Sequence, residues 1–339
     1  MPTFAQTKEE LLPQVTARKI FGLIKPEMAL VEAEFERQAR SNVQVINYLA
    51  EYLRVSGGKR VRPALLILTS HAVGGRGSDR NVIKLATVME MLHTATLVHD
   101  DIIDNADMRR NRESVNAKFG NQVAVLMGDW LYMSAFETAL EERSLAILDI
   151  LTNLTRKMTE GELIQLTMIG NAEIRQDEYF DILRRKTAYL FAGCCEIGAI
   201  LAGADERTQT AMRDYGMNLG VAFQLSDDLL DFTSSEDALG KAAGADLLEG
   251  KITLPLILLM NSEPAVKPKL EEIMFDGSYG PNSKQFLMDK LDEHNTLGKI
   301  RMTALAYAEK ARKNLEVLAK TEYCSALDEI PSFVIGRNS

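Results

Sequence analysis

Cysteine is scarce in this chain. Its 339 residues include only three, and two of these, Cys194 and Cys195, are adjacent. Such a set cannot build a disulfide framework, and it shows no metal-binding spacing with the four histidines. The sequence therefore does not describe a disulfide-stabilised extracellular module and predicts a protein of the reducing cytoplasm.

Long hydrophobic runs and a basic surface are missing as well. No run approaches the roughly 18 apolar residues of a membrane span, and residues 1–19 lack the apolar centre of a signal peptide. The formal net charge of -9 argues against a nucleic acid partner, because binding a phosphate backbone needs a basic surface. We therefore expect a soluble protein with other ligands.

Proline and aromatic residues are few, whereas hydrophobic residues make up 46% of the chain, and Ala, Leu and Met recur at three- and four-residue spacing. This composition predicts an all-α fold. No linker-like stretch divides the chain, so residues 1–339 are predicted to form a single helical domain. One amphipathic stretch is expected from about Glu32 to Val55, and Asp177 and Asp205 are predicted helix N-caps.

The most informative feature present is a repeated acidic pattern, Asp-Asp-x-x-Asp. Its two copies consist of Asp100, Asp101 and Asp104, and of Asp227, Asp228 and Asp231. On a helix the first and last Asp of each copy share a face, where like charges repel, so packing gives no reason for them. Magnesium does, because it prefers oxygen ligands and completes its shell with water and phosphate oxygens. Two such faces across a cavity predict a metal-held diphosphate clamp.

The alternative for one such pattern in an acidic protein is a solvated helix face. Two observations favour the functional interpretation, namely the repetition and the apolar residues that border both copies. His93 lies on the acidic face of the first helix and Gln224 on that of the second, so both are candidate substrate contacts. A helical bundle can build a metal site in its interior in this way.

Several basic residues are candidates for binding a second anionic substrate: Arg109 and Arg110 lie five and six residues beyond Asp104, and Lys59 and Arg62 follow a Gly-Gly turn. The candidates are Lys59, Arg62, Arg109, Arg110, Lys186 with Thr187, Lys241 and Lys251. Ordinary surface charge is the alternative explanation for each of them. A diphosphate, however, can be held by Arg through paired hydrogen bonds and by Lys as a point charge.

Taken together, these motifs resemble the trans-isoprenyl diphosphate synthases, densely over residues 31–260. The segments that carry the resemblance are Gly58-Lys59-Arg60, 92–104 with Arg109-Arg110, Gly161-Glu162, Lys186-Thr187, Phe223-Gln224 with the second acidic pattern, and Gly250-Lys251. The resemblance implies a single large antiparallel helical bundle with a central cavity. It also implies a homodimeric prenyltransferase that joins isopentenyl diphosphate head-to-tail to an allylic diphosphate.

The resemblance assigns roles to individual residues. Both acidic patterns would bind the allylic diphosphate through three Mg2+ ions, with Mn2+ able to replace them. The catalytic set would comprise Asp100, Asp101, Asp104, Arg109, Lys186, Asp227 and Lys241. Isopentenyl diphosphate would be bound by Lys59, Arg62, His93 and Arg110. Further substrate contacts would come from Thr187, Gln224 and Lys251. No side-chain general base is required, because the released diphosphate would take the proton.

Product length depends on how deep the growing tail can run below the acidic patterns. Ala95 and Thr96, about one helical turn before Asp100, are small, whereas short-chain members of the family carry a bulky aromatic there. The run 93–97 is similar to that of octaprenyl and related long-chain synthases, which implies a farnesyl primer and a quinone side chain as the destination. Candidates for the tunnel floor are Tyr132, Phe136 and Ala139, with Leu140 beside them.

Two departures and several alternatives remain. Gln165 stands where short-chain members usually carry Asp, and the C-terminus offers only Arg337 as a phosphate contact. A synthase that needs a small partner subunit, or one with a shorter geranylgeranyl or farnesyl product, would carry the same motifs. Peripheral membrane association for product release is also left open. A class I terpene cyclase fits less well because it normally lacks the second Asp-rich pattern, and a purely structural helical protein would not need either pattern.

Overall fold

The computed structural model describes residues 18–55, 57–58, 60–109, 112–233 and 243–336. Most of them are helical, which confirms the predicted all-α class. Within these ranges the only strands are β1 (Met108–Arg109) and β2 (Arg112–Glu113), which pair antiparallel. The predictions for Lys59, Arg110, Lys241 and Arg337 lie outside the described residues.

The helices fall into two groups along the chain. The first group is α2 (Lys25–Gln38), α3 (Gln44–Val55), α4 (Val61–Ala72), α5 (Arg80–Ile103), α6 (Val115–Phe119), α7 (Asn121–Leu140) and α8 (Leu145–Met168). The second group is α9 (Gln176–Leu183), the π-helical turn η1 (Arg184–Ala188), α10 (Tyr189–Leu201), α11 (Glu206–Thr233), α13 (Ala245–Leu248), α14 (Leu254–Ser262), the short 3-10 turn η2 (Pro264–Val266), α15 (Lys267–Asp276), α16 (Ser283–Glu293), α17 (Thr296–Asn314), a second 3-10 turn η3 (Leu315–Val317) and α18 (Glu322–Ile335).

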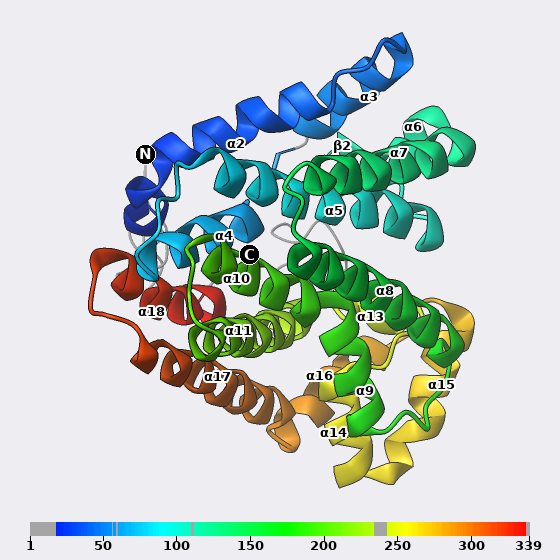
Figure 1. The fold of residues 1–339 in the computed structure, drawn as a ribbon. Coiled ribbons are helices and arrows are strands. Elements are labelled where there is room, and N and C mark those ends of the chain that lie inside the picture. The colour runs from blue at the N-terminus through cyan, green and yellow to red at the C-terminus, as the bar shows by residue number, and fades with distance from the viewer. Residues whose placement is uncertain (1–17, 56, 59, 110–111, 234–242, 337–339) are drawn as a thin grey trace, which may run out of the picture.

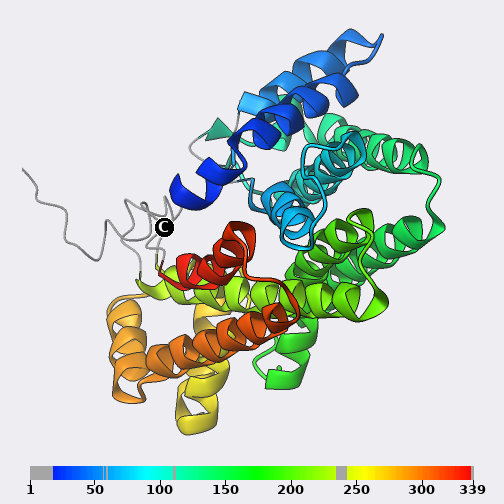
Figure 2. The ribbon, with the colours of Figure 1, turned by 60° about the vertical axis from the view of Figure 1, so that its left-hand side comes forward.

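Helix α11 runs through the middle of the molecule, and α10 and α17 lie along it (Figures 1 and 2). Helix α5 packs against α7 and α4, and α4 also packs on α10. In both views α2 and α3 lie at one end and α14 to α16 at the other. The two helices that carry the acidic patterns, α5 and α11, therefore belong to the interior of the bundle.

Two hydrophobic clusters meet at α11. Tyr215 and Leu219 belong to the cluster built mainly by α4, α5, α7 and α10, whereas Val221 and Leu225 belong to the cluster of α9 and α14 to α17. One continuous helix thus contributes to both clusters, and the single domain over residues 1–339 stays a prediction. In the part of the chain that the structure describes, no helix is both long and apolar enough to cross a membrane.

Some local predictions need correction. The amphipathic stretch from Glu32 to Val55 is divided between α2 and α3 by a break at residues 39–43. The Asp177 cap is wrong, because Asp177 is the second residue of α9 and the N-cap position is Arg175. The Asp205 cap is confirmed, since its Oδ1 accepts a hydrogen bond from the backbone N–H of Thr208 at 2.8 Å, before α11 begins.

Two glycines let α11 approach the preceding helical segment closely. A Cβ at Gly216 would lie 2.4 Å from the carbonyl oxygen of Phe191, and one at Gly220 would lie 2.5 Å from the Cα of Ala188. Side chains at these positions would push the backbones apart, because packed interiors cannot yield locally without strain. These glycines therefore set the distance between α11 and the segment formed by η1 and α10.

We expect Gly216→Ala to destabilise the fold by about 1 to 3 kcal/mol, because the new Cβ would overlap the backbone of α10. The matched control is Gly22→Ala, where the new Cβ would meet nothing within 4 Å and alanine favours the helix. Urea unfolding followed by circular dichroism measures both. Equal midpoints for the two variants would show that the glycine contact does not hold the helices together.

Candidate active site

A cavity of about 680 Å³ opens between α4, α5, α8, η1, α10 and α11. It brings together predicted site residues that are far apart in the sequence. Those that line it are Arg62, His93, Thr96, Asp100, Lys186, Thr187, Gln224 and Asp227. Its apolar lining comes from Val61, Leu97, Met158, Leu190 and Phe223. A lining that combines charged groups with apolar side chains suits a ligand with a charged head and an apolar tail.

The first acidic pattern lies at the C-terminal end of α5, and its three acids have different surroundings. Asp100 lines the cavity. Asp101 is 3% exposed, and its Oδ1 accepts a hydrogen bond from Arg109 Nε at 2.6 Å. Asp104, just beyond the helix, pairs with Lys251 Nζ at 2.9 Å.

The second pattern has a similar arrangement on α11. Asp227 lines the cavity, whereas Asp228 is 2% exposed and bonded to protein groups. Asp228 accepts hydrogen bonds from Tyr179 Oη and, at 3.0 Å, from Gln224 Nε2. In both patterns the first acid therefore faces the cavity, and the middle acid is held by another side chain.

The acids of this site suit a divalent cation. Asp231 Oδ2 is buried and has no hydrogen-bond partner among the described residues, while its Oδ1 accepts from the backbone N–H of Ala245 at 3.1 Å. A buried carboxylate oxygen without a partner is costly unless a cation or proton compensates it. Hard oxygen ligands of this kind are those that magnesium takes. The assignment of all six acids as metal ligands stays a prediction.

Burial also governs the protonation of these acids. It raises the pKa of Asp100 to about 7, against the opposing effect of the Lys186 ammonium, and Glu162 and Asp104 raise it further. Burial and the neighbouring Asp246 raise the pKa of Asp228 to about 7. The same two causes raise the pKa of Asp231 to about 7. Without a cation, the site therefore favours bound protons near neutral pH.

Lys186 and Thr187 lie in the π-helical turn η1, a wider turn of the kind often found at functional sites. Lys186 Nζ lies 2.7 Å from Gln165 Oε1 and 2.5 Å from Glu162 Oε2. Gln165, which stands where short-chain members of the family usually carry Asp, therefore contacts Lys186, one of the predicted diphosphate-binding side chains. Thr187 Oγ1 donates a hydrogen bond to Gln224 Oε1 at 2.9 Å. The turn thus joins α8 and α11 at the cavity.

A second cavity of about 210 Å³ lies on the other side of Lys186, Thr187 and Gln224, which line both spaces. Two further predicted residues, Asp228 and Lys251, belong to its wall. The predicted substrate contact Lys251 is held by Asp104 and by Glu249, at 2.9 and 2.8 Å. Lys251, in the segment that follows α13, thus connects this segment to Asp104 of the first acidic pattern.

A third cavity of about 140 Å³ shares Thr96, Asp100 and Lys186 with the largest one. Tyr132 lines it, and the rings of Tyr132 and His99 stack with centroids 5.8 Å apart. Gly128 makes room for this pair, since a Cβ there would lie 2.2 Å from His99 Nε2. Of the predicted tunnel residues, Thr96 and Tyr132 reach these cavities.

The other tunnel candidates take different places. Ala95 and Ala139 are fully buried, and Phe136 is partly buried against the first hydrophobic cluster. None of these three lines a cavity described above. Leu140 is 47% exposed at the end of α7. Their role at the tunnel floor stays a prediction.

Sequence patterns missed several residues that shape the site. Arg60, in the left-handed region with φ 47°, is partly buried and pairs with Glu90 at 2.7 Å and with Glu32 at 2.8 Å. Glu90 was detectable as an acid inside the apolar run 88–92, whereas Arg60 was seen only as part of a motif. Tyr179 carried no signal, because its partner Asp228 comes from another helix.

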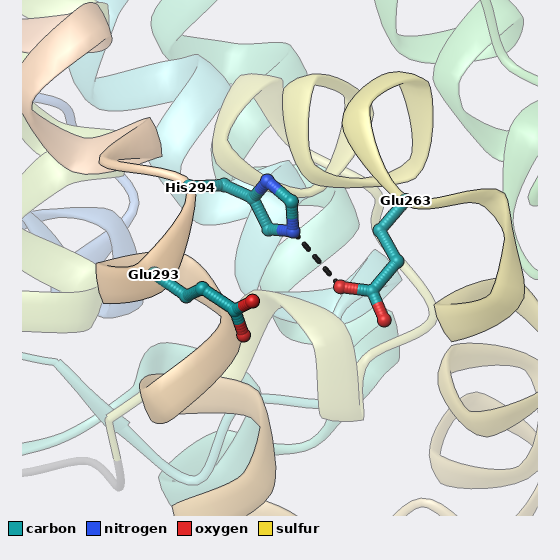
Figure 3. A group of neighbouring side chains, drawn as sticks. All are labelled: Glu263, Glu293 and His294. Carbon is teal, nitrogen blue, oxygen red and sulfur yellow. Dashed lines mark hydrogen bonds and ion pairs between the residues drawn. The ribbon is translucent and has the colours of Figure 1, made fainter.

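A second group of possible metal ligands lies elsewhere, where Glu263, Glu293 and His294 come together at the ends of α14 and α16 (Figure 3). His294 Nε2 lies 2.8 Å from Glu263 Oε2. Lys290 Nζ lies 2.9 Å from Glu263 and 3.0 Å from Glu293. A lysine ammonium thus already pairs with both carboxylates, and these ion pairs tie α14 to α16.

Comparisons with known proteins agree with this geometry. The sequence model of the family described as "Polyprenyl synthetase" matches residues 43–291. The chain is 38% identical to octaprenyl diphosphate synthase of Haemophilus influenzae, over 94% of this chain and 97% of that protein. It is 36% identical to the Escherichia coli octaprenyl diphosphate synthase, over 94% and 98% of the two chains.

Solved structures show the same fold. A polyprenyl synthase from Caulobacter crescentus CB15, complexed with calcium and isoprenyl diphosphate, superposes with a TM-score of 0.89 at 35% identity, covering 95% of this chain and 98% of that one. A heptaprenyl diphosphate synthase from Staphylococcus aureus superposes with a TM-score of 0.88 at 30% identity, over 93% and 99% of the chains.

An all-helical fold with two acidic patterns at one cavity defines an enzyme that acts on diphosphates with a divalent metal. The chain belongs to the polyprenyl synthetase family and is a prenyltransferase, a trans-prenyl diphosphate synthase. Enzymes of this family use allylic and isopentenyl diphosphates as substrates.

We expect the metal-free protein to lose stability as the pH rises from about 5 to about 7.5. In this window the folded chain keeps protons on Asp100 and Asp228, whose pKa values are about 7, while the unfolded carboxyls release theirs near 3.8. The folded state therefore binds more protons, and raising the pH favours unfolding. Thermal unfolding in EDTA measures this trend, and Asp228→Asn should weaken it. A stability that rises across the same window would contradict the raised pKa values.

Proposed function

We propose that this enzyme condenses isopentenyl diphosphate repeatedly onto farnesyl diphosphate and releases a long-chain polyprenyl diphosphate, about octaprenyl in length, for quinone side chains. The octaprenyl diphosphate synthases among its relatives support a long product. The small side chain of Thr96 on the cavity wall supports it as well, because no aromatic ring blocks the path at that position.

The observation that carries the proposal is the meeting of Asp100 and Asp227 at one cavity with Arg62, His93 and Lys186. Asp100 comes from α5 and Asp227 from α11, so acids from two helices face the same space. Lys186 adds positive charge to this cavity, and Arg62 and His93 also line it. Two anionic heads, one held through metal and one by cations, can therefore be placed side by side.

In this mechanism the two acidic patterns would hold Mg2+, three ions in the proposed arrangement with Mn2+ able to replace them. Bound metal would supply positive charge that stabilises the diphosphate as it leaves the allylic carbon. Lys186, Arg109 and Lys241 would assist on the allylic side, and Lys59, Arg62, His93 and Arg110 would orient isopentenyl diphosphate. The aliphatic walls at Leu97, Met158 and Leu190 would keep water from the carbocation.

We further propose that the enzyme is a homodimer of the reducing cytoplasm. Helix α7 exposes Val125, Leu126, Met133 and Leu140 although its other faces are already buried. Exposed apolar side chains on one helix support an interface, and a second copy of the chain would cover them. All three cysteines are free, in agreement with a reducing compartment. A small partner subunit would instead show as inactivity of the purified chain alone.

The decisive experiment incubates the purified chain with farnesyl diphosphate, labelled isopentenyl diphosphate and Mg2+, and then sizes the products by reversed-phase chromatography. Asp100→Asn and Asp227→Asn should each lower turnover by several orders of magnitude, because they remove charge that holds the metal. Asp149→Asn, an exposed acid of α8, serves as the matched control and should keep wild-type turnover. Undiminished turnover in excess EDTA would rule out the proposal. A geranylgeranyl product would show that the proposed product length is too long.

Product length gives a separate test. Thr96→Phe should shorten the product to farnesyl or geranylgeranyl length, because the ring would fill space where two cavities meet next to Asp100. Ala95→Phe should shorten it less and destabilise the fold by about 1 to 3 kcal/mol, because Ala95 is fully buried away from those cavities. Chromatography of the dephosphorylated products distinguishes the two. Shortening by Ala95→Phe alone would show that the tail follows the other face of α5.

A further inference from the structure

Four side chains form a continuous hydrogen-bonded network behind the second acidic pattern. Tyr179 Oη donates to Asp228 Oδ2. Gln224 Nε2 donates to Asp228 Oδ1 at 3.0 Å, and Thr187 Oγ1 donates to Gln224 Oε1 at 2.9 Å. The donor and acceptor of every bond agree, so one orientation of the Gln224 amide satisfies the whole series.

The network joins two helical segments at two points. Tyr179 and Thr187 belong to the continuous segment formed by α9 and η1, whereas Gln224 and Asp228 lie one turn apart on α11. Tyr179 bonds to Asp228 at one end of this contact, and Thr187 bonds to Gln224 at the other. Because Gly220 lets α11 approach η1 at Ala188, the bonds form across helices that are already in close contact.

The network ends at the cavity. Thr187 and Gln224 line the large cavity together with Asp227, which precedes Asp228 in the chain. If Asp228 lost the bond from Tyr179, its carboxylate could rotate, and the Gln224 amide and Thr187 hydroxyl would lose their fixed orientation. Asp227, Gln224 and Thr187 would then present a less ordered surface to an anionic ligand.

Packing alone does not account for this tyrosine. Tyr179 is 6% exposed, next to Phe180 and within an apolar cluster in which a phenylalanine ring would pack equally well. Burying a hydroxyl against a carboxylate removes both from water, and this desolvation offsets part of the stability that their hydrogen bond contributes. The hydroxyl therefore contributes orientation more than stability.

We propose that Tyr179 is a positioning residue that holds the second acidic pattern, through Asp228, Gln224 and Thr187, in the arrangement that binds the metal-bound diphosphate of the allylic substrate. The proposal rests on the function assigned above. Tyr179 lies outside both acidic patterns and is not one of the predicted basic residues.

The test compares Tyr179→Phe with Tyr215→Phe. Tyr215 is a matched control, because it is also fully buried and its hydroxyl also donates one hydrogen bond, to the carbonyl oxygen of Leu327 at 2.7 Å, away from the cavity. Titration calorimetry measures the binding of inorganic diphosphate in saturating Mg2+. We expect Tyr179→Phe to weaken this binding about tenfold, as for a lost hydrogen bond to a charged group, and Tyr215→Phe to leave it unchanged.

Kinetics provide a second readout. Tyr179→Phe should raise the KM for the allylic substrate more than the KM for isopentenyl diphosphate. A double-mutant cycle with Gln224→Ala should show that the two effects on diphosphate binding are not additive, as expected for one network. Additive effects, equal changes for both substrates, or the same loss in Tyr215→Phe would overturn the positioning role.

The result also separates this proposal from the function on which it rests. If the wild-type chain does not bind diphosphate in the presence of Mg2+, the proposed function fails. If the wild type binds and Tyr179→Phe binds equally well, only the role of Tyr179 fails.

Discussion

The rest of the site depends on carboxylates that are placed in an apolar interior. Burial raises the pKa of Asp100, Asp228 and Asp231 to about 7, so their charges are unfavourable until a cation compensates them. Neighbouring groups stabilise the charges of these acids in different ways. Arg109 neutralises Asp101, and Tyr179 with Gln224 donates hydrogen bonds to Asp228. Asp100 and Asp227 line the large cavity.

Helix α11 connects this electrostatic constraint to the architecture. It belongs to both hydrophobic clusters, and it carries the second acidic pattern. Gly216 and Gly220 let it contact the backbone of the segment formed by η1 and α10. Lys186 and Thr187, on the π-helical turn of that segment, consequently reach the same cavity as Asp227. The close packing of α11 on this segment therefore also helps to set which side chains line the cavity.

Two neighbouring residues that were predicted to control product length have different surroundings in the fold. Ala95 and Thr96 differ by one position, or about 100° around a helix. Thr96 faces the cavities beside Asp100, whereas Ala95 is fully buried and does not line them. A sequence motif cannot distinguish these two positions, because both lie one turn before the acidic pattern.

The sequence alone determined the all-α class and the two helices that carry the acidic patterns. It also predicted that cations such as Lys186 and Arg62 share their site. The helical class and the acidic helix faces follow from composition and from residue spacing within single helices, which are local properties, whereas the roles of Lys186 and Arg62 were implied by the family resemblance. Only the tertiary structure decided that Asp100 and Asp227 face the cavity while Asp101 and Asp228 face protein partners. Arg109 and Gln224 are near Asp101 and Asp228 in sequence, but other partners of the acids are distant: Tyr179 is 49 residues from Asp228, and Lys251, which pairs with Asp104, is 147 residues away. Such contacts arise from helix packing, which no local pattern encodes.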